Sequence, residues 1–148
     1  MPKIRVTKEF SFEMAHALYG YDGACKNIHG HSYVMHVSVI GEPVYDSAHV
    51  KNGMVIDFSD LKKIVKEKIV DEVDHAQVLN GDSPHRQLES LHSNFEKIIF
   101  VHYQPTCENL LIDFKNRIEK LLPKYVKLQS MRLSETTSSY AEWFADDN

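Results

Sequence analysis

The sequence predicts one α+β domain that spans residues 1–148. Its N-terminal segment alternates polar and apolar residues, as a strand with one buried face does. Two later segments repeat apolar residues at helical spacing, and the C-terminal part returns to short runs of β-branched and aromatic residues. The predicted order is therefore strand, strand, helix, helix, strand, strand, with one additional short strand between the helices.

The first two strands are predicted from alternation alone. From Ile4 to Met14 the apolar residues occupy even positions, and Lys8 is the exception. After a loop of turn-forming residues at 20–24, the odd positions between residues 29 and 40 carry the more apolar set. Two successive strands of this kind tend to pair antiparallel, so the end of the first should lie beside the start of the second.

Capping residues and helical periodicity define the two helices. Ser59 is predicted to cap the first helix, which runs to about Asp74 with one apolar stripe. Thr106 is predicted to cap the second helix, and Pro123 ends it. The other predicted elements are a turn at residues 80–84 and strands at residues 97–103, 127–133 and 139–144.

Composition and charge exclude several classes of protein. The chain is 43% hydrophobic and 26% charged with a formal net charge of -4, and its basic residues form no stripe that would bind nucleic acid. No apolar run is long enough to span a membrane, and no leader is expected before the first strand. Two cysteines do not make a disulfide framework, so we expect a cytoplasmic protein with reduced thiols.

Three histidines point to a metal site. His29 and His31 are separated by one residue, so in an extended strand both side chains point to the same side. Antiparallel pairing of the first two strands brings His16 next to them. Three imidazole ligands with one open position are the pattern of catalytic zinc, which is the predicted cofactor.

Cys25 is open to two interpretations. It could be the fourth ligand of a closed, structural zinc site, or a free thiol beside the metal that is available as a thiolate. Asp74 and His75, which are neighbours in the sequence, favour the second interpretation. A thiolate needs a base such as His75, and that base needs an orienting carboxylate such as Asp74.

These motifs resemble those of the 6-pyruvoyl-tetrahydropterin synthase family, and most closely its queuosine-pathway branch, the 6-carboxy-5,6,7,8-tetrahydropterin synthases. The resemblance begins with His16 and with the motif Cys25-x-x-x-His29-Gly30-His31. It extends over nearly the whole chain, through Asp57-Phe58, Asp74-His75, Pro105-Thr106-x-Glu108 and Glu135. The gap of three residues between Cys25 and His29 matches the queuosine branch.

The resemblance implies a tunnelling fold, which is an antiparallel sheet with two helices on one face. In that fold several subunits close a barrel and share active sites, so a homo-oligomer, a hexamer in this family, is expected. The implied reaction converts 7,8-dihydroneopterin triphosphate to 6-carboxy-5,6,7,8-tetrahydropterin, acetaldehyde and triphosphate. The expected partner is therefore this small-molecule substrate, with no nucleic acid and no membrane.

The resemblance also implies roles for nine residues. The implied zinc ligands are His16, His29 and His31. The implied catalytic residues are Cys25, which transfers protons, and its partners Asp74 and His75. The implied pterin-binding residues are Glu135, Thr106 and Glu108.

Two other functions are left open by the sequence. A 6-pyruvoyl-tetrahydropterin synthase would eliminate triphosphate and keep every side-chain carbon, and a zinc-binding module with Cys25 as a closed fourth ligand would have no activity. Residues 80–103 are longer than in compact members of the family. We expect this segment to add a sheet edge or a contact between subunits.

Overall fold

The structure is a computed structural model that describes all 148 residues. Six strands form one sheet in the order β4-β3-β1-β2-β5-β6. The strands are β1 (Ile4–His16), β2 (His29–Gly41), β3 (Ala76–Asn80), β4 (Ile98–Val101), β5 (Lys127–Ser134) and β6 (Tyr140–Phe144). The α-helical segments are α1 (Phe58–Val65), which continues through a π-helical turn (Lys66–Val70) into α2 (Asp71–Val73), and α3 (Cys107–Leu121). Three 3₁₀ helices cover Ala24–Lys26, Pro84–Ser93 and Ala145–Asp147.

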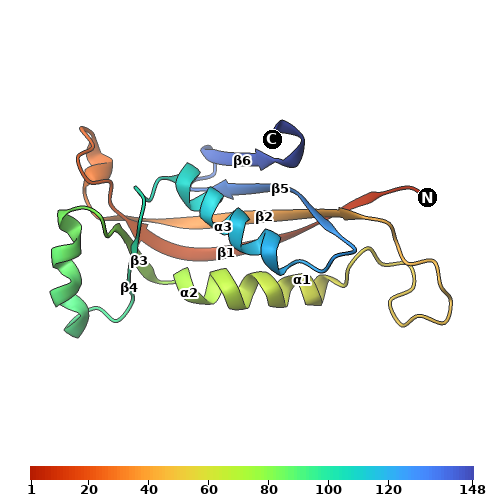
Figure 1. Cartoon of the computed structure of the whole chain (residues 1–148). Coiled ribbons are helices and arrows are strands. Elements are labelled where there is room, and N and C mark those ends of the chain that lie inside the picture. Colours follow the sequence, from red (N-terminus) through yellow and green to blue (C-terminus); the bar gives the residue numbers. More distant parts are fainter.

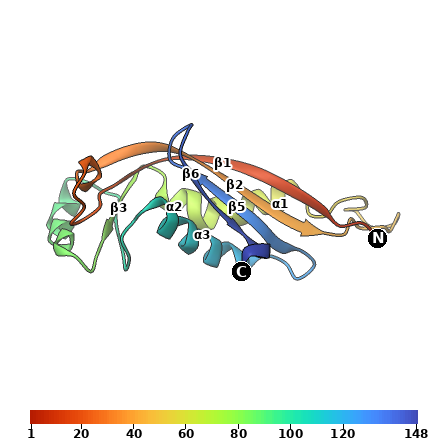
Figure 2. The ribbon, with the colours of Figure 1, turned by 90° about the horizontal axis from the view of Figure 1, so that it is seen from above.

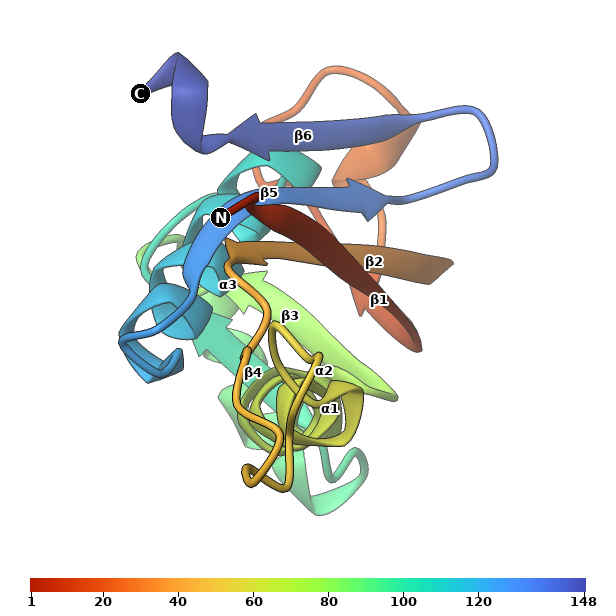
Figure 3. The ribbon, with the colours of Figure 1, turned by 90° about the vertical axis from the view of Figure 1, so that its right-hand side faces the viewer.

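The continuous helix α1–α2 and helix α3 cover the same face of the sheet (Figures 1 and 3). Even-numbered residues of β1 and odd-numbered residues of β2 point toward these helices and supply seven of the 25 residues of the main core cluster. Phe12, Tyr33, Leu61 and Phe114 are among the buried side chains that join the two layers. The opposite side of the sheet, here called the helix-free face, is lined by more polar side chains. The predicted α+β class, with helices on one face, is confirmed.

The sheet is mixed, which differs in part from the expected antiparallel sheet. Strands β1, β2, β5 and β6 do pair antiparallel, but β3 lies parallel to β1, and β4 lies parallel to β3. A helical segment precedes β3 and another lies between β3 and β4, so each time the chain returns in the same direction. The sequence predicted only one of these two short strands.

The hairpin of β1 and β2 spans the molecule from one end to the other (Figure 2). Its register pairs Ile4 with Gly41 at one end and His16 with His29 at the other. The N-terminus and the loop before α1 lie at the first end, and the loop between β1 and β2 lies at the second (Figure 1). This pairing is the antiparallel arrangement that was predicted for two successive strands.

The ends of the helices follow the predicted capping with one correction. The prediction that Ser59 caps the first helix is wrong, because Asp57 accepts a hydrogen bond from the Ser59 amide at 2.9 Å and α1 begins at Phe58. Thr106 caps α3 as predicted, with its hydroxyl accepting from the Asn109 amide at 3.2 Å. Each helix is too short or too polar to serve as a membrane-spanning helix.

Residues 80–103 contain more structure than the predicted turn and strand. After β3, the 3₁₀ helix Pro84–Ser93 turns outward and is visible at the end of the molecule in Figure 1. Its Leu88 and Leu91 pack on a small separate core of Ala17, Leu79 and Ile98. This packing anchors the 3₁₀ helix beside the loop between β1 and β2.

Candidate metal centre and active site

The three histidines meet at one end of the central hairpin. His16 of β1 lies directly opposite His29 of β2, and His31 follows two residues later on the same face. The ring centroids are 4.5 Å apart for His16 and His29, 5.2 Å for His16 and His31, and 5.0 Å for His29 and His31. One nitrogen from each ring lies within 4.8 Å of the other two. The triad is therefore positioned to bind one metal ion.

Backbone carbonyls orient two of the three rings. Nδ1 of His16 donates to the Pro105 carbonyl at 2.6 Å, and Nδ1 of His29 donates to the Asn27 carbonyl at 2.7 Å. Because a carbonyl oxygen can only accept, each ring carries its proton on Nδ1 and keeps the Nε2 lone pair free. Both Nε2 atoms are buried without a hydrogen-bond partner. A metal ion supplies the missing partner of such atoms, so the residues present fit a bound metal.

Burial keeps His16 in the form that binds metal. The side chain is almost fully buried, and this burial lowers the pKa of His16 below its ordinary value. The hydrogen bond to Pro105 and the nearby carboxylate of Glu135 act in the opposite direction but are outweighed. A neutral imidazole is the metal-binding form, so the surroundings of His16 favour coordination over protonation.

Glu135, the first residue after β5, reaches the edge of the triad. Its carboxylate oxygens lie 3.6 Å from Nε2 of His16 and 4.0 Å from Nε2 of His31. Both distances exceed a hydrogen bond, and the carboxylate does not belong to the cluster of possible ligand atoms. The carboxylate is therefore close enough to bind a molecule that lies over the centre.

Tyr33 borders the triad, and the sequence reasoning did not single it out. Its ring centroid lies 5.5 Å from that of His31 and 6.2 Å from that of His16. The side chain is fully buried and its hydroxyl has no hydrogen-bond partner. Burial, together with the charge of Glu135, raises the pKa of Tyr33 far above its ordinary value, so the hydroxyl stays a neutral donor. The sequence does indicate this position, because Tyr33 is two residues after His31 in β2 and so points to the same side of the strand as His29 and His31.

Cys25 lies in the 3₁₀ helix Ala24–Lys26, just before β2, and is half-buried. Its carbonyl accepts a hydrogen bond from the Leu18 amide at 2.9 Å, which closes the loop between the two strands. The thiol is not part of the cluster of possible metal ligands. It makes no hydrogen bond to Asp74 or His75, whose side-chain polar contacts lie with each other and with β1. One chain alone therefore does not bring the three predicted catalytic residues into contact.

Asp74 and His75 form the turn between α2 and β3. Nδ1 of His75 lies 3.1 Å from Oδ1 of Asp74, and the same oxygen accepts from the Glu13 amide at 2.9 Å. The His75 amide donates to the Glu13 carbonyl, so both residues are bonded to β1. The hydrogen bond from the Glu13 amide, followed by the contact with His75, lowers the pKa of Asp74. Asp74 is therefore a carboxylate in a fixed place beside an imidazole.

His75 borders a groove of about 310 Å³. The groove is lined by Glu13, Ala15 and Ser32, whose positions in β1 and β2 belong to the helix-free face. The metal triad lies on the helix-covered face, although His31 also borders the groove. Within one chain, the sheet therefore separates most of the triad from His75.

The start of α3 lies beside the triad. Pro105, whose carbonyl accepts from His16, directly precedes Thr106. The Thr106 hydroxyl is used as the helix cap, and its amide and carbonyl are bonded to Gln104 and Leu110. Glu108 is exposed in the first turn of α3, a position that the helix dipole favours for a carboxylate.

Fold and site together define a protein of the tunnelling-fold class with three histidines positioned to bind a metal ion. The chain matches the family model described as 6-pyruvoyl tetrahydropterin synthase over residues 5–146. It is 39% identical over 141 residues to a 6-carboxy-5,6,7,8-tetrahydropterin synthase of Haemophilus influenzae. This match covers 94% of the chain and 97% of the relative. The chain belongs to the 6-pyruvoyl tetrahydropterin synthase family.

Two further relatives show the breadth of this similarity. A dihydroneopterin monophosphate aldolase of Pyrococcus furiosus is 33% identical over 133 residues, with 90% of each chain covered. The structure of the Caenorhabditis elegans 6-pyruvoyl tetrahydropterin synthase has a TM-score of 0.68 at 25% identity, and covers 98% of this chain and 97% of that one. Relatives of this fold thus carry the names of three different pterin reactions.

Proposed function

We propose that residues 1–148 form one catalytic domain that converts 7,8-dihydroneopterin triphosphate to 6-carboxy-5,6,7,8-tetrahydropterin, acetaldehyde and triphosphate. Membership of the family makes the chain a lyase of the pterin-synthase type. The 39% identity to the relative from H. influenzae over nearly the full length supports the carboxylated product and a place in queuosine biosynthesis. The free thiols of Cys25 and Cys107 are in keeping with a cytoplasmic enzyme.

The proposal depends above all on the two buried Nε2 atoms of His16 and His29, which have no partner and lie within reach of one ion together with His31. Three neutral imidazoles suit zinc, so these three residues would hold it. A bound zinc ion supplies Lewis acidity to the side-chain oxygens of the substrate, which makes neighbouring protons easier to remove. The thiol of Cys25 lies outside the ligand cluster, which supports an open fourth position.

Residues at the edge of the centre would bind the pterin ring. The carboxylate of Glu135 can accept two parallel N–H bonds, from the 2-amino group and from a ring nitrogen of the pterin. Thr106 and Glu108 would contact the substrate from the start of α3, which adjoins the triad through Pro105. The substrate side chain would then lie over the three histidines.

Proton transfer is assigned to Cys25 and the Asp74–His75 pair. The Cys25 thiolate would take a proton from the side-chain carbon next to the ring. His75 would exchange that proton, and Asp74 would hold the imidazole in one orientation from 3.1 Å. This division of roles leaves Cys25 free of the metal.

We propose that the active form is a homo-oligomer, a hexamer as in the family, in which His75 of one chain meets Cys25 of a neighbour. The separation of the two residues within one chain supports this arrangement, as does the opening of the His75 groove on the helix-free face. Mixing Cys25→Ala and His75→Ala chains tests it, because each supplies the residue that the other lacks. Random reassembly should restore about one quarter of the activity. Mixed oligomers without recovery would contradict the shared site.

Product analysis by mass spectrometry tests the reaction itself. We expect 6-carboxytetrahydropterin together with acetaldehyde. The relative from P. furiosus favours a second candidate, an aldolase, which would release the side chain without forming a carboxylate. A pyruvoyl product without acetaldehyde would instead assign the chain to the pyruvoyl synthases.

Two substitutions test the division of roles in the site. Cys25→Ala should retain zinc and lose turnover, and full activity in this variant would exclude the thiolate role. His29→Ala should lose both metal and activity, because it removes one of three ligands. Metal content measured by elemental analysis separates the two outcomes, and zinc retained at full content by His29→Ala would exclude the triad as the metal centre.

A further inference from the structure

His75 is held in a conformation that its side chain disfavours. It follows Asp74 at the end of α2 with a φ of 62°, and it is the only non-glycine residue with a positive φ. Helices most often place glycine at this position. A histidine stays there only where neighbouring groups hold the turn, so those groups control the placement of the imidazole.

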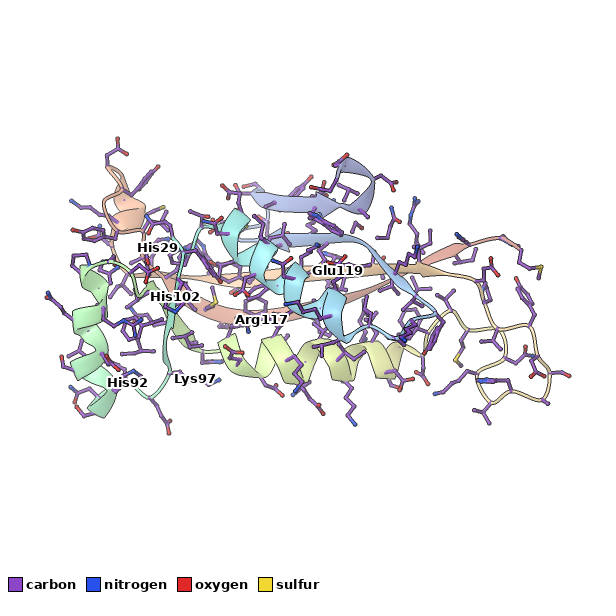
Figure 4. All side chains as sticks on the ribbon, viewed as in Figure 1. His29, His92, Lys97, His102, Arg117 and Glu119 are labelled. Atoms are coloured by element: carbon purple, nitrogen blue, oxygen red, sulfur yellow. The ribbon has the colours of Figure 1, made fainter.

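Lys97 is one of the groups that hold this turn. Its ammonium donates to the Asp74 carbonyl at 2.7 Å and to the Asp71 carbonyl at 2.9 Å. These carbonyls lie at the C-terminal end of the helix, where the helix itself supplies no partner. Figure 4 shows Lys97 beside this end of the helix. A positive charge is also favoured there by the helix dipole.

The main chain of Lys97 is bonded on the other side of His75. Its carbonyl accepts from the Gln77 amide at 2.9 Å, two residues after His75. Lys97 thus contacts the chain before the histidine through its side chain and after the histidine through its backbone. Together with the bonds from Glu13, these contacts fix both ends of the turn.

Lys97 belongs to residues 80–103, the segment that we expect from the sequence to be longer than in compact members of the family. The 3₁₀ helix Pro84–Ser93 packs on the small core around Leu79, and the chain then returns to β4 through Lys97. The returning residues also line a cavity of about 440 Å³ together with His75. Lys97, which directly precedes β4 in this segment, thus touches the candidate catalytic turn.

We propose that Lys97 is a positioning residue for His75, and that the segment 80–103 serves to deliver this ammonium to the turn. The inference rests on the proposed role of His75 in proton transfer. An ammonium has three donors and can bond both carbonyls at once. Methionine has a similar length and no donor, whereas arginine keeps both charge and donors.

The test compares Lys97→Met and Lys97→Arg with a control, Lys66→Met. Lys66 is a suitable control because it bonds the side chain of Asp71 at 2.7 Å and makes no hydrogen bond to Asp74. Turnover of 7,8-dihydroneopterin triphosphate gives kcat and KM, and hydrogen–deuterium exchange of the peptide 71–77 reports on the turn without any catalysis. Thermal unfolding shows whether each variant is folded.

In Lys97→Met we expect kcat to fall about 10-fold to 100-fold with KM nearly unchanged, because the base is misplaced while substrate binding persists. Exchange of peptide 71–77 should become about 10-fold faster, because opening of the turn costs less free energy. Lys97→Arg should restore most of both quantities, and Lys66→Met should leave both near the values of the unaltered protein.

The proposal is overturned if Lys97→Met leaves exchange of peptide 71–77 unchanged, or if it lowers kcat no more than Lys66→Met does. Faster exchange with unchanged kcat would make Lys97 a structural cap without a positioning role. If the unaltered protein does not turn over the substrate, the proposed function fails, and the exchange experiment still decides whether Lys97 holds the turn.

Discussion

Two aspartate–histidine pairs lie at opposite ends of β3. Asp74 and His75 precede the strand with Nδ1 and Oδ1 3.1 Å apart, and Asp82 and His102 meet beyond its other end at 3.0 Å. The two imidazoles are equally exposed, at 76% and 79%. Side-chain geometry therefore does not distinguish a candidate catalytic pair from a surface ion pair.

The backbone around each pair makes the difference. Asp74 and His75 are bonded to Glu13 through two main-chain contacts, and His75 is strained and borders a groove. Asp82 is held only by a turn, in which its amide donates to Asn80, and the pair lines none of the larger grooves near the site. The main-chain contacts that fix Asp74 and His75 are thus what indicates a function for this pair. Exposed pairs without such support contribute little.

The largest expected difference between the pairs is in turnover. His75→Ala should lower kcat by about 100-fold or more, which is the range for removal of a general acid–base group. His102→Ala should leave kcat within about twofold, because its partner Asp82 is a solvated surface residue. Steady-state kinetics at saturating substrate measures both. Equal losses in the two variants would show that the constrained backbone of His75 has no catalytic meaning.

A smaller difference is expected for the carboxylates. Asp74→Asn keeps an oxygen that can accept from the Glu13 amide, but it removes the charge beside His75. We expect kcat to fall about 10-fold, because the imidazole loses its orienting anion. Asp82→Asn should have no measurable effect on kcat. The same kinetic assay checks both, and unchanged turnover in Asp74→Asn would restrict the catalytic role to His75.

The contrast between the pairs also shows what the sequence could predict. Asp74 and His75 are adjacent, so their pairing was visible before the structure, as was the parity that groups His29 and His31. The pairing of His16 with His29 followed from antiparallel strands joined by one loop. These features depend on short separations along the chain.

Features that depend on β3 could not be predicted in the same way. This strand has only five residues and follows the helix directly, so it gives no clear periodic signal. Its parallel pairing with β1 and β4 is what joins Asp82 to His102 and brings Lys97 to the Asp74–His75 turn.

His75 should also differ from His102 in its effect on stability. Glycine adopts a positive φ without strain, so His75→Gly should raise the free energy of unfolding by about 1 kcal/mol while it lowers kcat as His75→Ala does. His102 has no positive φ, and His102→Gly should lower stability slightly through the entropy of the unfolded chain. Chemical denaturation of the two variants measures the difference. A loss of stability in His75→Gly would mean that the ring contributes more than its strained backbone costs.

The smallest expected effect is on the pH dependence of stability. The bond from the Glu13 amide lowers the pKa of Asp74 below its ordinary value of 3.8, so the folded state binds a proton at this group less readily than the unfolded chain does. The stability that Asp74 contributes is therefore complete above the unfolded value and is lost as the pH falls through 3.8 toward the lower folded value. Denaturation midpoints between about pH 5 and pH 3 should fall more steeply in the unaltered protein than in Asp74→Asn, which has no proton to bind. Because Asp74 is partly exposed, solvent screening keeps this difference small. Parallel curves for the two proteins would show that Glu13 orients Asp74 without stabilising its charge.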